Sequence, residues 1–552
     1  MPLHAEPNHA AGAFVRSQTQ GPVVPLIEKT IAAAFDDAVA RNPAGTALVS
    51  CHQNVRLSYE ELRDKVEALA AGLWSVGIRP GDRIGVWASN CLEWICLQFS
   101  AARTGAVLVN VNPAYRSHEL RYVLARSRMK AIFLHEQDAR VNYLQVLEES
   151  RHGQELALEH VIVLGSDAWN ALADERGPAP RPALTPEDVA NIQYTSGTTG
   201  APKGVLLTHR NLLNNAMLIG RQMQVSSADR LCSPVPLYHC FGCVMSSLMT
   251  MVNSAALVLP AAQFDATATL RAIHDERCTM LYGVPTMFIA ELEHPDFESY
   301  DLTSLRTGIM AGAPCPVEVM QKVTGRMHCR DLTIAYGQTE SSPVITMSSL
   351  EDGIGLRVST VGRVMPNTEV KVVSPDTGEA VPTGTMGELC TRGYLVMKGY
   401  DGDPEGTAAA IDSEGWLHTG DIAIMRPDGY FHIRGRLKDT IIRGGENIYP
   451  REIEEFLHQH PDIADVYVVG IPHERLGETV LAWIRLKNGA RMTVADVRDF
   501  CRGRIAYFKT PQYVRFVDEF PMTVTGKVQK YRIREIEIEE RGLRAAQSIR
   551  TA

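Results

Sequence analysis

A segment rich in hydroxyl groups and glycine offers the clearest chemistry in this sequence. Tyr194-Thr-Ser-Gly-Thr-Thr-Gly-Ala-Pro-Lys-Gly204 directly follows an apolar run. Its hydroxyl groups and the Lys203 ammonium could surround phosphate oxygens in a flexible polar loop. The spacing differs from a Walker A loop, which closes on lysine followed by Ser or Thr. The segment therefore predicts a phosphate loop of another kind, with these candidate contacts: Thr195, Ser196, Gly197, Thr198, Thr199 and Lys203.

Two later segments also combine side chains that could bind a ligand. Ala335-Tyr336-Gly-Gln-Thr339-Glu340 places an aromatic face, a hydroxyl and a hard oxygen ligand within five residues. Trp416-Leu-His-Thr-Gly-Asp421 ends in a carboxylate. Each segment alone also fits an ordinary turn, so their combination carries the argument.

These segments, in this order, resemble the motifs of the adenylate-forming superfamily: acyl-CoA synthetases, peptide-synthetase adenylation domains and beetle luciferases. The match continues through Arg434-Gly-Arg-Leu-Lys-Asp439, Gly444-Gly-Glu-Asn-Ile-Tyr-Pro450 and Pro521-Met-Thr-Val-Thr-Gly-Lys-Val-Gln-Lys530. The resemblance implies an α/β adenylate-forming fold. It has a large N-terminal domain of layered αβ sheets with a β-rich subdomain, residues 1–437, and a small mobile α+β C-terminal domain, residues 438–552.

The resemblance also implies roles for the nucleotide-binding residues. Tyr336 stacks on adenine and Thr339 holds the α-phosphate. Glu340 binds Mg²⁺, which makes it the expected metal ligand. Asp421 binds the ribose, and Arg436 is a second nucleotide contact.

Further roles follow from the same resemblance. Gly312 and Ala313, in Ala311-Gly-Ala-Pro314, shape the adenine and acyl slots. Lys438 stands at the hinge between the domains. The catalytic Lys527 reaches the acyl carboxylate and the α-phosphate, and a glycine pair in the C-terminal domain contacts CoA: Gly444 and Gly445.

His239 allows two interpretations. Pro236-Leu-Tyr-His239 resembles the segment that lines the acyl tunnel, where His239 would lie beside the substrate carboxylate as a catalytic residue. A buried structural histidine is the alternative. The neighbouring Cys240 and Cys243 form a C-x-x-C, but the sequence has no second pair at zinc-ribbon spacing. We interpret both thiols as core residues.

The substrate is expected to be a carboxylic acid, with ATP and CoA as co-substrates and Mg²⁺ as cofactor. No acidic residue lies between Leu231 and Phe264 to pair with an amino group, and no carrier domain fits after Lys527. The terminal Thr551-Ala552 is not the peroxisomal signal of luciferases. Among the members of the superfamily, an acid:CoA ligase is therefore the expected class.

The sequence also resembles the medium-chain, family member 2 type of acyl-CoA synthetase over its full length, through Asn112-Pro-Ala-Tyr115, Tyr282-Gly-Val-Pro-Thr-Met287, Pro295-Asp-Phe297 and Arg443-Gly-Gly-Glu-Asn-Ile-Tyr-Pro450. A linear medium-chain fatty acid is therefore expected. A ligase for an aryl or a short or branched acid stays open, as does a catalytically silent nucleotide-binding homologue.

Composition agrees with a globular enzyme that acts on small molecules. The formal net charge of −9 gives no reason to expect nucleic acid as a partner. Eleven cysteines are too sparse for a disulfide scaffold and indicate the cytoplasm. The longest uncharged stretch, residues 231–264, is interrupted by proline and polar residues, so we expect no transmembrane segment. A homodimer is a possible assembly.

Apolar runs alternate with helical periodicity between residues 83 and 164, which predicts parallel sheets covered by helices. Shorter strands separated by glycine and proline turns follow Gly362 and predict a β-rich unit. The strands expected before Gly362 are 83–88, 106–110, 131–134, 161–164, 191–195, 256–259, 280–284 and 307–310.

Overall fold

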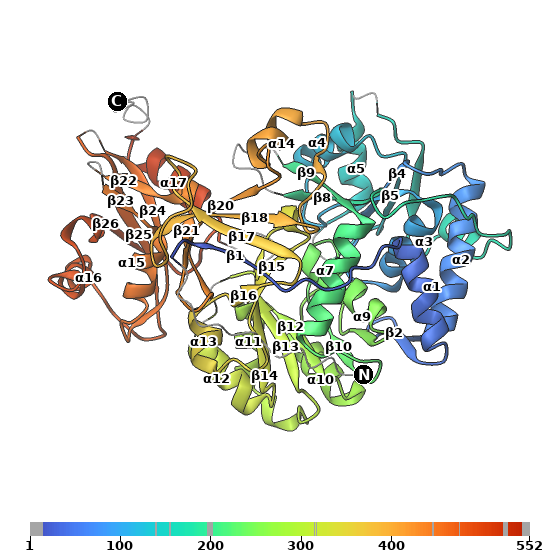
Figure 1. The fold of residues 1–552 in the computed structure, drawn as a ribbon, viewed down its shortest axis with the longest axis horizontal. Coiled ribbons are helices and arrows are strands. Elements are labelled where there is room, and N and C mark those ends of the chain that lie inside the picture. The colour runs from blue at the N-terminus through green and yellow to red at the C-terminus, as the bar shows by residue number, and fades with distance from the viewer. Residues whose placement is uncertain are drawn as a thin grey trace.

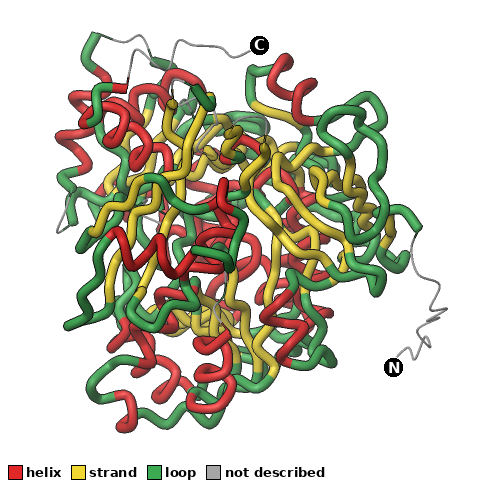
Figure 2. Tube along the Cα trace, turned by 90° about the vertical axis from the view of Figure 1, so that its left-hand side faces the viewer, coloured by secondary structure: helices red, strands yellow, loops and turns green. Residues whose placement is uncertain are grey.

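The structure, a computed structural model, describes residues 15–138, 141–153, 156–195, 202–313, 315, 317–443, 446–473, 475–522 and 528–543. Two large sheets, a smaller β sheet and a C-terminal unit make up the chain (Figure 1). Helices flank the strands, and loops lie mostly at the periphery (Figure 2). No helix within the described ranges is long and apolar enough to cross a membrane.

The first large sheet has seven strands in the order β19-β9-β8-β5-β4-β6-β7. Strands β8, β5, β4, β6 and β7 run parallel, as the alternating pattern predicts. The antiparallel edge formed by β9 and β19 was not expected. Its strands are β4 (Arg83–Trp87), β5 (Val107–Asn110), β6 (Ala131–Leu134), β7 (His160–Val163), β8 (Val189–Thr195), β9 (Lys203–Thr208) and β19 (Gly399–Tyr400).

The second large sheet has nine strands in the order β16-β15-β14-β13-β12-β10-β11-β2-β3, parallel from β14 to β2 and antiparallel at both edges. Its strands are β2 (Thr46–Ser50), β3 (Val55–Ser58), β10 (Arg230–Cys232), β11 (Ala256–Leu259), β12 (Met280–Gly283), β13 (Thr307–Ala311), β14 (Asp331–Gly337), β15 (Val344–Met347) and β16 (Arg363–Val364).

Helix α7 lies between the two large sheets (Figure 1), and nearly all its residues from His209 to Gly220 are buried. The other N-terminal helices are α1 (Ile31–Arg41), α2 (Tyr59–Ser75), α3 (Leu92–Thr104), α4 (Ser117–Ser127), α5 (Tyr143–Arg151), α6 (Asp167–Ala173), α7 (His209–Gln222), α8 (Cys240–Gly242), the π-helix η1 (Cys243–Leu248), α9 (Met249–Val252), α10 (Ala266–Glu276), α11 (Pro285–Leu292), η2 (Phe297–Ser299), α12 (Val317–Arg326), η3 (Thr339–Ser341), α13 (Ile354–Ser359) and α14 (Pro404–Ala410).

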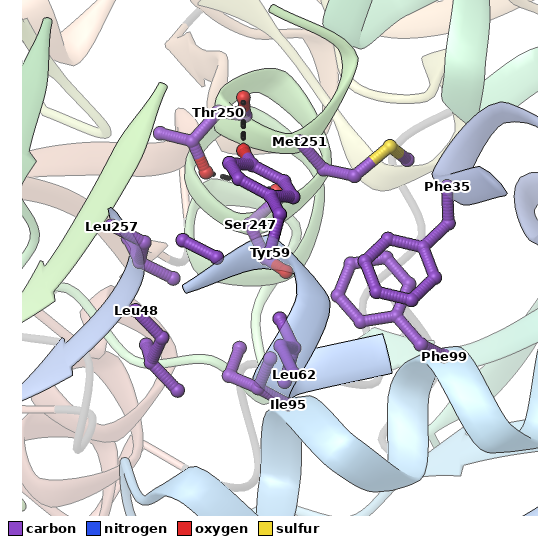
Figure 3. A pocket seen from close by; sticks show the side chains of 11 residues that line it. Phe35, Leu48, Tyr59, Leu62, Ile95, Phe99, Ser247, Thr250, Met251 and Leu257 are labelled. Atoms are coloured by element: carbon purple, nitrogen blue, oxygen red, sulfur yellow. Dashed lines mark hydrogen bonds between the residues drawn. The ribbon is translucent and has the colours of Figure 1, made fainter. Parts of the chain in front are cut away.

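Local capping fixes where several helices begin. Ser58 accepts a hydrogen bond from the Glu61 amide, and the Glu61 carboxylate accepts one from the Ser58 amide. This capping box fixes the start of α2 after Ser58. The packing beneath α1, α2 and α3 leaves a cavity of about 10 Å³, enough for about one water molecule. Figure 3 shows stacked Phe35 and Phe99 at its edge, with ring centroids 4.6 Å apart.

The β-rich unit is a sheet in the order β1-β17-β18-β20-β21. Its residues join the main apolar core of the large sheets, so it belongs to the same body. Strand β1 pairs antiparallel with β17, which brings an N-terminal segment onto this sheet. The strands are β1 (Gln18–Gln20), β17 (Thr368–Val373), β18 (Met386–Gly393), β20 (Leu417–Met425) and β21 (Phe431–Arg436).

The C-terminal unit has apolar clusters of its own. One joins the sheet to α15 and α16, and the other joins its opposite face to α17. The unit is therefore an α+β body, seen at the left of Figure 1. Its elements are η4 (Leu437–Asp439), β22 (Ile441–Arg443), β23 (Glu446–Ile448), α15 (Pro450–Leu457), β24 (Ile463–His473), β25 (Gly477–Leu486), α16 (Val494–Cys501), η5 (Tyr507–Lys509), β26 (Tyr513–Phe516) and α17 (Lys530–Glu540).

Candidate nucleotide-binding site

The described ends of the predicted phosphate segment lie on the hairpin of β8 and β9 in the first large sheet. Tyr194 and Thr195 end β8, and Lys203 and Gly204 begin β9, with Thr195 opposite Lys203. Lys203 therefore projects from a strand rather than from a free loop, which corrects the sequence interpretation. The remaining candidate contacts of this segment lie outside the described residues: Ser196, Gly197, Thr198 and Thr199.

The predicted metal ligand Glu340 lies close to this hairpin. The Thr195 hydroxyl is 3.4 Å from Glu340 Oε1, although the two residues are far apart in sequence. The Tyr400 hydroxyl donates to the same oxygen at 3.0 Å. Glu340 belongs to η3, directly after β14, and its backbone carbonyl accepts from the Met397 amide at 3.0 Å. Three polypeptide segments thus converge on one carboxylate.

Tyr400, which belongs to none of the sequence motifs, joins the phosphate hairpin to this carboxylate. The Lys203 ammonium lies over the Tyr400 ring, 4.6 Å from its centroid, a cation–π arrangement. Lys203 Nζ is also 3.7 Å from Asp403 Oδ2. Burial and the nearby Glu340 charge raise the pKa of Tyr400, so its hydroxyl stays protonated and donates. An aromatic residue among the acids of Gly399-Tyr-Asp-Gly-Asp403 was the available signal.

A partly buried ion pair anchors this edge of the sheet. Arg83 makes two hydrogen bonds of 2.8 Å to the Asp401 carboxylate. The Asp401 amide donates to the Gly204 carbonyl at 2.7 Å. A side chain at Gly204 would press against Ile192 and Tyr194. The pair and this backbone hydrogen bond therefore fix the backbone next to Lys203.

The second group of predicted nucleotide residues is also brought together. Tyr336 ends β14 and its hydroxyl donates to Asp421 Oδ2 at 2.7 Å. Arg436 Nε is 2.8 Å from Asp421 Oδ1, because the two residues are direct cross-strand partners on β20 and β21. Burial, followed by the Asp421 charge, raises the pKa of Tyr336. Tyr336 and Glu340 are four positions apart, so this group adjoins the Lys203 group.

His239 lies at a third part of the site. Its Nδ1 accepts from the Phe241 amide at 3.2 Å and caps α8. Nδ1 is therefore unprotonated in the neutral ring, and the proton is on Nε2. Next to it, Cys240 Sγ is 3.9 Å from the Thr339 hydroxyl, which connects this segment to the predicted α-phosphate contact. The cap is a structural role, and the catalytic role stays a prediction.

The other predicted residues fall at element ends. Gly312 follows β13 with φ of 85°, a left-handed conformation that glycine adopts without strain. Ala313 is exposed beside it. Lys438 is exposed within η4. The predicted CoA and acyl contacts of the C-terminal unit lie outside the described residues: Gly444, Gly445 and Lys527.

Comparisons with known proteins identify the family to which the chain belongs. The chain belongs to the AMP-binding enzyme family: that family's model matches residues 35–401, and the model of the AMP-binding enzyme C-terminal domain matches residues 452–527. The predicted superfamily, α/β fold and reaction class of an AMP-forming acid:thiol ligase are confirmed by these matches and by the relatives described next.

Three relatives illustrate the similarity. A Bacillus subtilis protein provisionally named as the acyl-CoA synthetase YngI is 46% identical, covering 95% of this chain and all of its own length. The human mitochondrial medium-chain acyl-CoA ligase ACSF2 is 40% identical over 92% of this chain and 88% of its own. The crystal structure of ATP-bound MatB from Rhodopseudomonas palustris superposes with a TM-score of 0.83 at 28% identity, covering 93% and 99% of the two chains.

Proposed function

We propose that this chain is an ATP-dependent fatty acid:CoA ligase that prefers medium-chain acids. It converts a carboxylate and ATP to an acyl-adenylate and pyrophosphate, and then transfers the acyl group to CoA with release of AMP. The names of the YngI and ACSF2 relatives support the ligase reaction, and the ACSF2 name supports the medium-chain preference. ATP and CoA are therefore the co-substrates.

The observation that carries the proposal is the convergence of Lys203, Tyr400 and Glu340 beside the Tyr336, Asp421 and Arg436 group. The first group offers a cation and oxygen ligands suited to phosphates. The second offers an aromatic residue and a carboxylate suited to a nucleoside. A catalytically silent homologue would not need both groups of residues, so the presence of both groups favours catalysis.

The charge of the reactants explains the roles of these residues. A carboxylate oxygen attacks the α-phosphorus, and negative charge accumulates between the entering acid and the leaving pyrophosphate. The Lys203 ammonium stabilises this charge in the transition state. We propose that Lys527 does the same from the C-terminal unit, and that Thr339 and His239 contact the reacting groups. Asp421 would release Tyr336 or Arg436 in order to accept from ribose hydroxyls.

The residues around Glu340 fit Mg²⁺. Its carboxylate and the nearby Thr195 hydroxyl supply hard oxygen atoms, which Mg²⁺ prefers. We propose that Glu340 holds the ion, with waters and phosphate oxygens completing its coordination. The ion, when bound, neutralises phosphate charge and orients the polyphosphate. Tyr400 would keep the Glu340 carboxylate in place for it.

We propose a domain boundary after Leu437, with Lys438 as the hinge. The separate apolar clusters on either side and the two family matches support it. Few polar contacts bridge the boundary among the described residues, one being Arg434 with Glu455 at 3.6 Å. Rotation at Lys438 would bring Gly444 and Gly445 toward the acyl-adenylate for the CoA step.

An acid panel tests the substrate. Release of AMP that depends on both acid and CoA should be most efficient, by kcat/KM, with straight-chain acids of medium length. A maximum with aryl or short branched acids would replace the proposed substrate class, and no activity with any acid would favour the silent homologue. We also propose the cytoplasm, because all eleven cysteines are free thiols, and a homodimer, which light scattering would test.

A further inference from the structure

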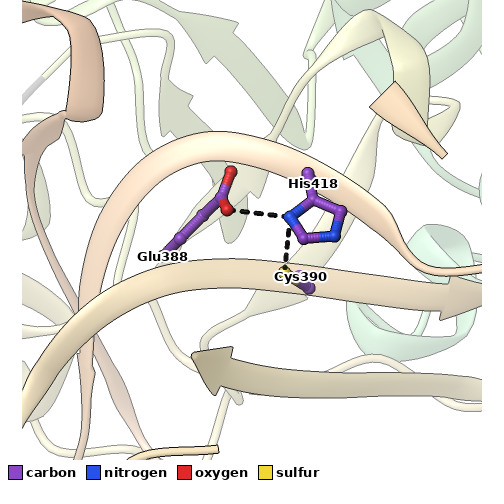
Figure 4. A group of neighbouring side chains, drawn as sticks. All are labelled: Glu388, Cys390 and His418. Atoms are coloured by element: carbon purple, nitrogen blue, oxygen red, sulfur yellow. Dashed lines mark hydrogen bonds and ion pairs between the residues drawn. The ribbon is translucent and has the colours of Figure 1, made fainter. Parts of the chain in front are cut away.

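Three potential metal ligands meet on the β-rich sheet, away from Glu340. Glu388 and Cys390 are two positions apart on β18, so their side chains share a face. His418 lies on β20, directly opposite Cys390. Figure 4 shows the three side chains pointing toward one another. One potential ligand atom of each residue lies within 4.8 Å of those of the other two. Among the described residues, this is the group of three His, Cys, Asp or Glu side chains that meets this distance.

The distances suit a small tetrahedral ion. Cys390 Sγ is 3.5 Å from His418 Nδ1. A zinc ion with Zn–S near 2.3 Å and Zn–N near 2.0 Å holds such atoms about 3.5 Å apart. Glu388 Oε2 is 2.8 Å from His418 Nδ1, and an opening of about half an ångström would admit the ion between them.

The surrounding groups orient these ligands. Asp412 Oδ2 is 3.7 Å from His418 Nε2, longer than a hydrogen bond, and a small shift would give the carboxylate–histidine contact that commonly supports zinc ligands. Asp412 is itself held by the amides of Glu414 and Trp416, each 2.9 Å from Oδ1. Glu388 Oε1 accepts from the Gly420 amide at 3.0 Å, which leaves Oε2 directed at the cluster.

The electrostatics also favour a cation. Glu388 and Asp412 supply two carboxylates next to His418. The nearby positive side chains, Lys371 and Arg392, lie over the Trp416 ring, 4.4 Å and 4.5 Å from its centroid. The His418 side chain is 31% exposed and gives access from solvent.

We propose that Glu388 Oε2, Cys390 Sγ and His418 Nδ1 form a binding site for Zn²⁺, with water as the fourth ligand. The thiol proton passes to solvent as the zinc–sulfur bond forms, so no oxidant or reductant is needed. The sulfur and imidazole ligands select zinc over Mg²⁺, which prefers oxygen. This site does not depend on the proposed function. It adjoins the ribose carboxylate, because Gly420 precedes Asp421.

Cobalt binding to the full chain tests the proposal. Co²⁺ titrated into the protein with excess Mg²⁺ should give a near-ultraviolet sulfur-to-cobalt band, and Zn²⁺ should abolish it. Cys390→Ser should lose the band, His418→Gln should weaken cobalt affinity at least 100-fold, and Asp412→Asn should weaken it about 10-fold to 100-fold. The matched control is Cys501→Ser, another buried cysteine, which should keep the band.

The proposal is overturned if the wild-type protein gives no band. It is also overturned if Cys390→Ser keeps the band, or if Cys501→Ser removes it. Thermal unfolding identifies a variant that fails to fold. If Cys390→Ser does not fold, His418→Gln decides alone, because the His418 side chain is partly exposed. Unchanged cobalt affinity in that variant would reject the site.

Discussion

Replacing Tyr400 by Phe isolates one hydrogen bond in the proposed adenylation site. The variant removes the hydroxyl that donates to Glu340 at 3.0 Å and retains the ring beneath Lys203. The Lys203 cation–π contact should therefore persist. What changes is the number of donors that hold the Glu340 carboxylate.

The contacts set the size of the effect. A hydrogen bond to a charged group contributes about 1.5 to 3 kcal/mol. Glu340 is half-buried and keeps the longer Thr195 contact of 3.4 Å, so water can replace part of the loss. We take the lower end, about 1.5 kcal/mol, which corresponds to roughly a tenfold change in rate.

The assay is acid-dependent exchange of pyrophosphate into ATP, measured against Mg²⁺ concentration. Tyr400→Phe should lower kcat/KM for ATP about tenfold, and more Mg²⁺ should be needed for half-maximal rate. Tyr194→Phe is the matched control, because the Tyr194 hydroxyl is buried in the same hairpin and has no hydrogen-bond partner among the described residues. Its rate should stay near wild type.

Two results would refute this reasoning. One is a Tyr400→Phe rate and Mg²⁺ dependence equal to wild type, which would separate Tyr400 from the function of Glu340. The other is an equal loss in Tyr194→Phe, which would indicate general damage to the hairpin. Unfolding temperatures of both variants, measured without substrates, distinguish damage to the fold from damage to the site.

Four further perturbations test other parts of the structure. Burial lowers the pKa of His209 to about 4, and its Nδ1 accepts a hydrogen bond from the Ile31 amide. This folded-state pKa is below the unfolded value of about 6.5. Up to about 3 kcal/mol of folding stability is therefore present above pH 6.5 and is lost as the pH falls toward 4. His209→Gln should flatten this part of the pH dependence of unfolding, and an unchanged slope would reject the assignment. Leu62→Ala enlarges the cavity of Figure 3 and should lower the free energy of unfolding by about 3 kcal/mol in denaturant titrations; a loss below about 1 kcal/mol would mean that the site collapses. Lys438→Pro restricts the proposed hinge, so pyrophosphate exchange should persist while acyl transfer to CoA falls steeply, and near-wild-type rates for both steps would place the hinge elsewhere. Lys527→Ala should slow acyl-adenylate formation by at least about a hundredfold, roughly 2.7 kcal/mol, while thioester formation from synthetic acyl-adenylate largely survives; equal loss in both steps would contradict its role.

The parallel parts of both large sheets could be predicted because each strand is a short apolar run followed by helical periodicity. The antiparallel edge strands of these sheets could not be predicted in this way. Lys203 and Gly204 belong to a motif whose composition is typical of a loop, yet they begin β9 by pairing with Thr195 and Tyr194 of β8. Strand β1 exists through its pairing with β17, at residues far away in the sequence.

In the site, too, residues within local motifs could be predicted, whereas residues that matter through contacts distant in sequence could not. Tyr336, Asp421 and Arg436 were found through motifs, and the structure joins them by direct hydrogen bonds and ion pairs. Tyr400 was missed because its importance arises from two distant partners, Lys203 and Glu340. The cluster of Glu388, Cys390 and His418 depends on the register of β18 and β20, which sequence spacing does not specify.

The products of ATP test the proposed reaction most directly. The protein is incubated with octanoate, CoA, Mg²⁺ and ATP labelled at the α-phosphate, and the nucleotide and thioester products are quantified together. We predict equal amounts of AMP and octanoyl-CoA, with labelled acyl-adenylate accumulating on the enzyme when CoA is omitted. Formation of ADP in place of AMP, or ATP consumption that does not depend on any carboxylic acid, would contradict the proposed function.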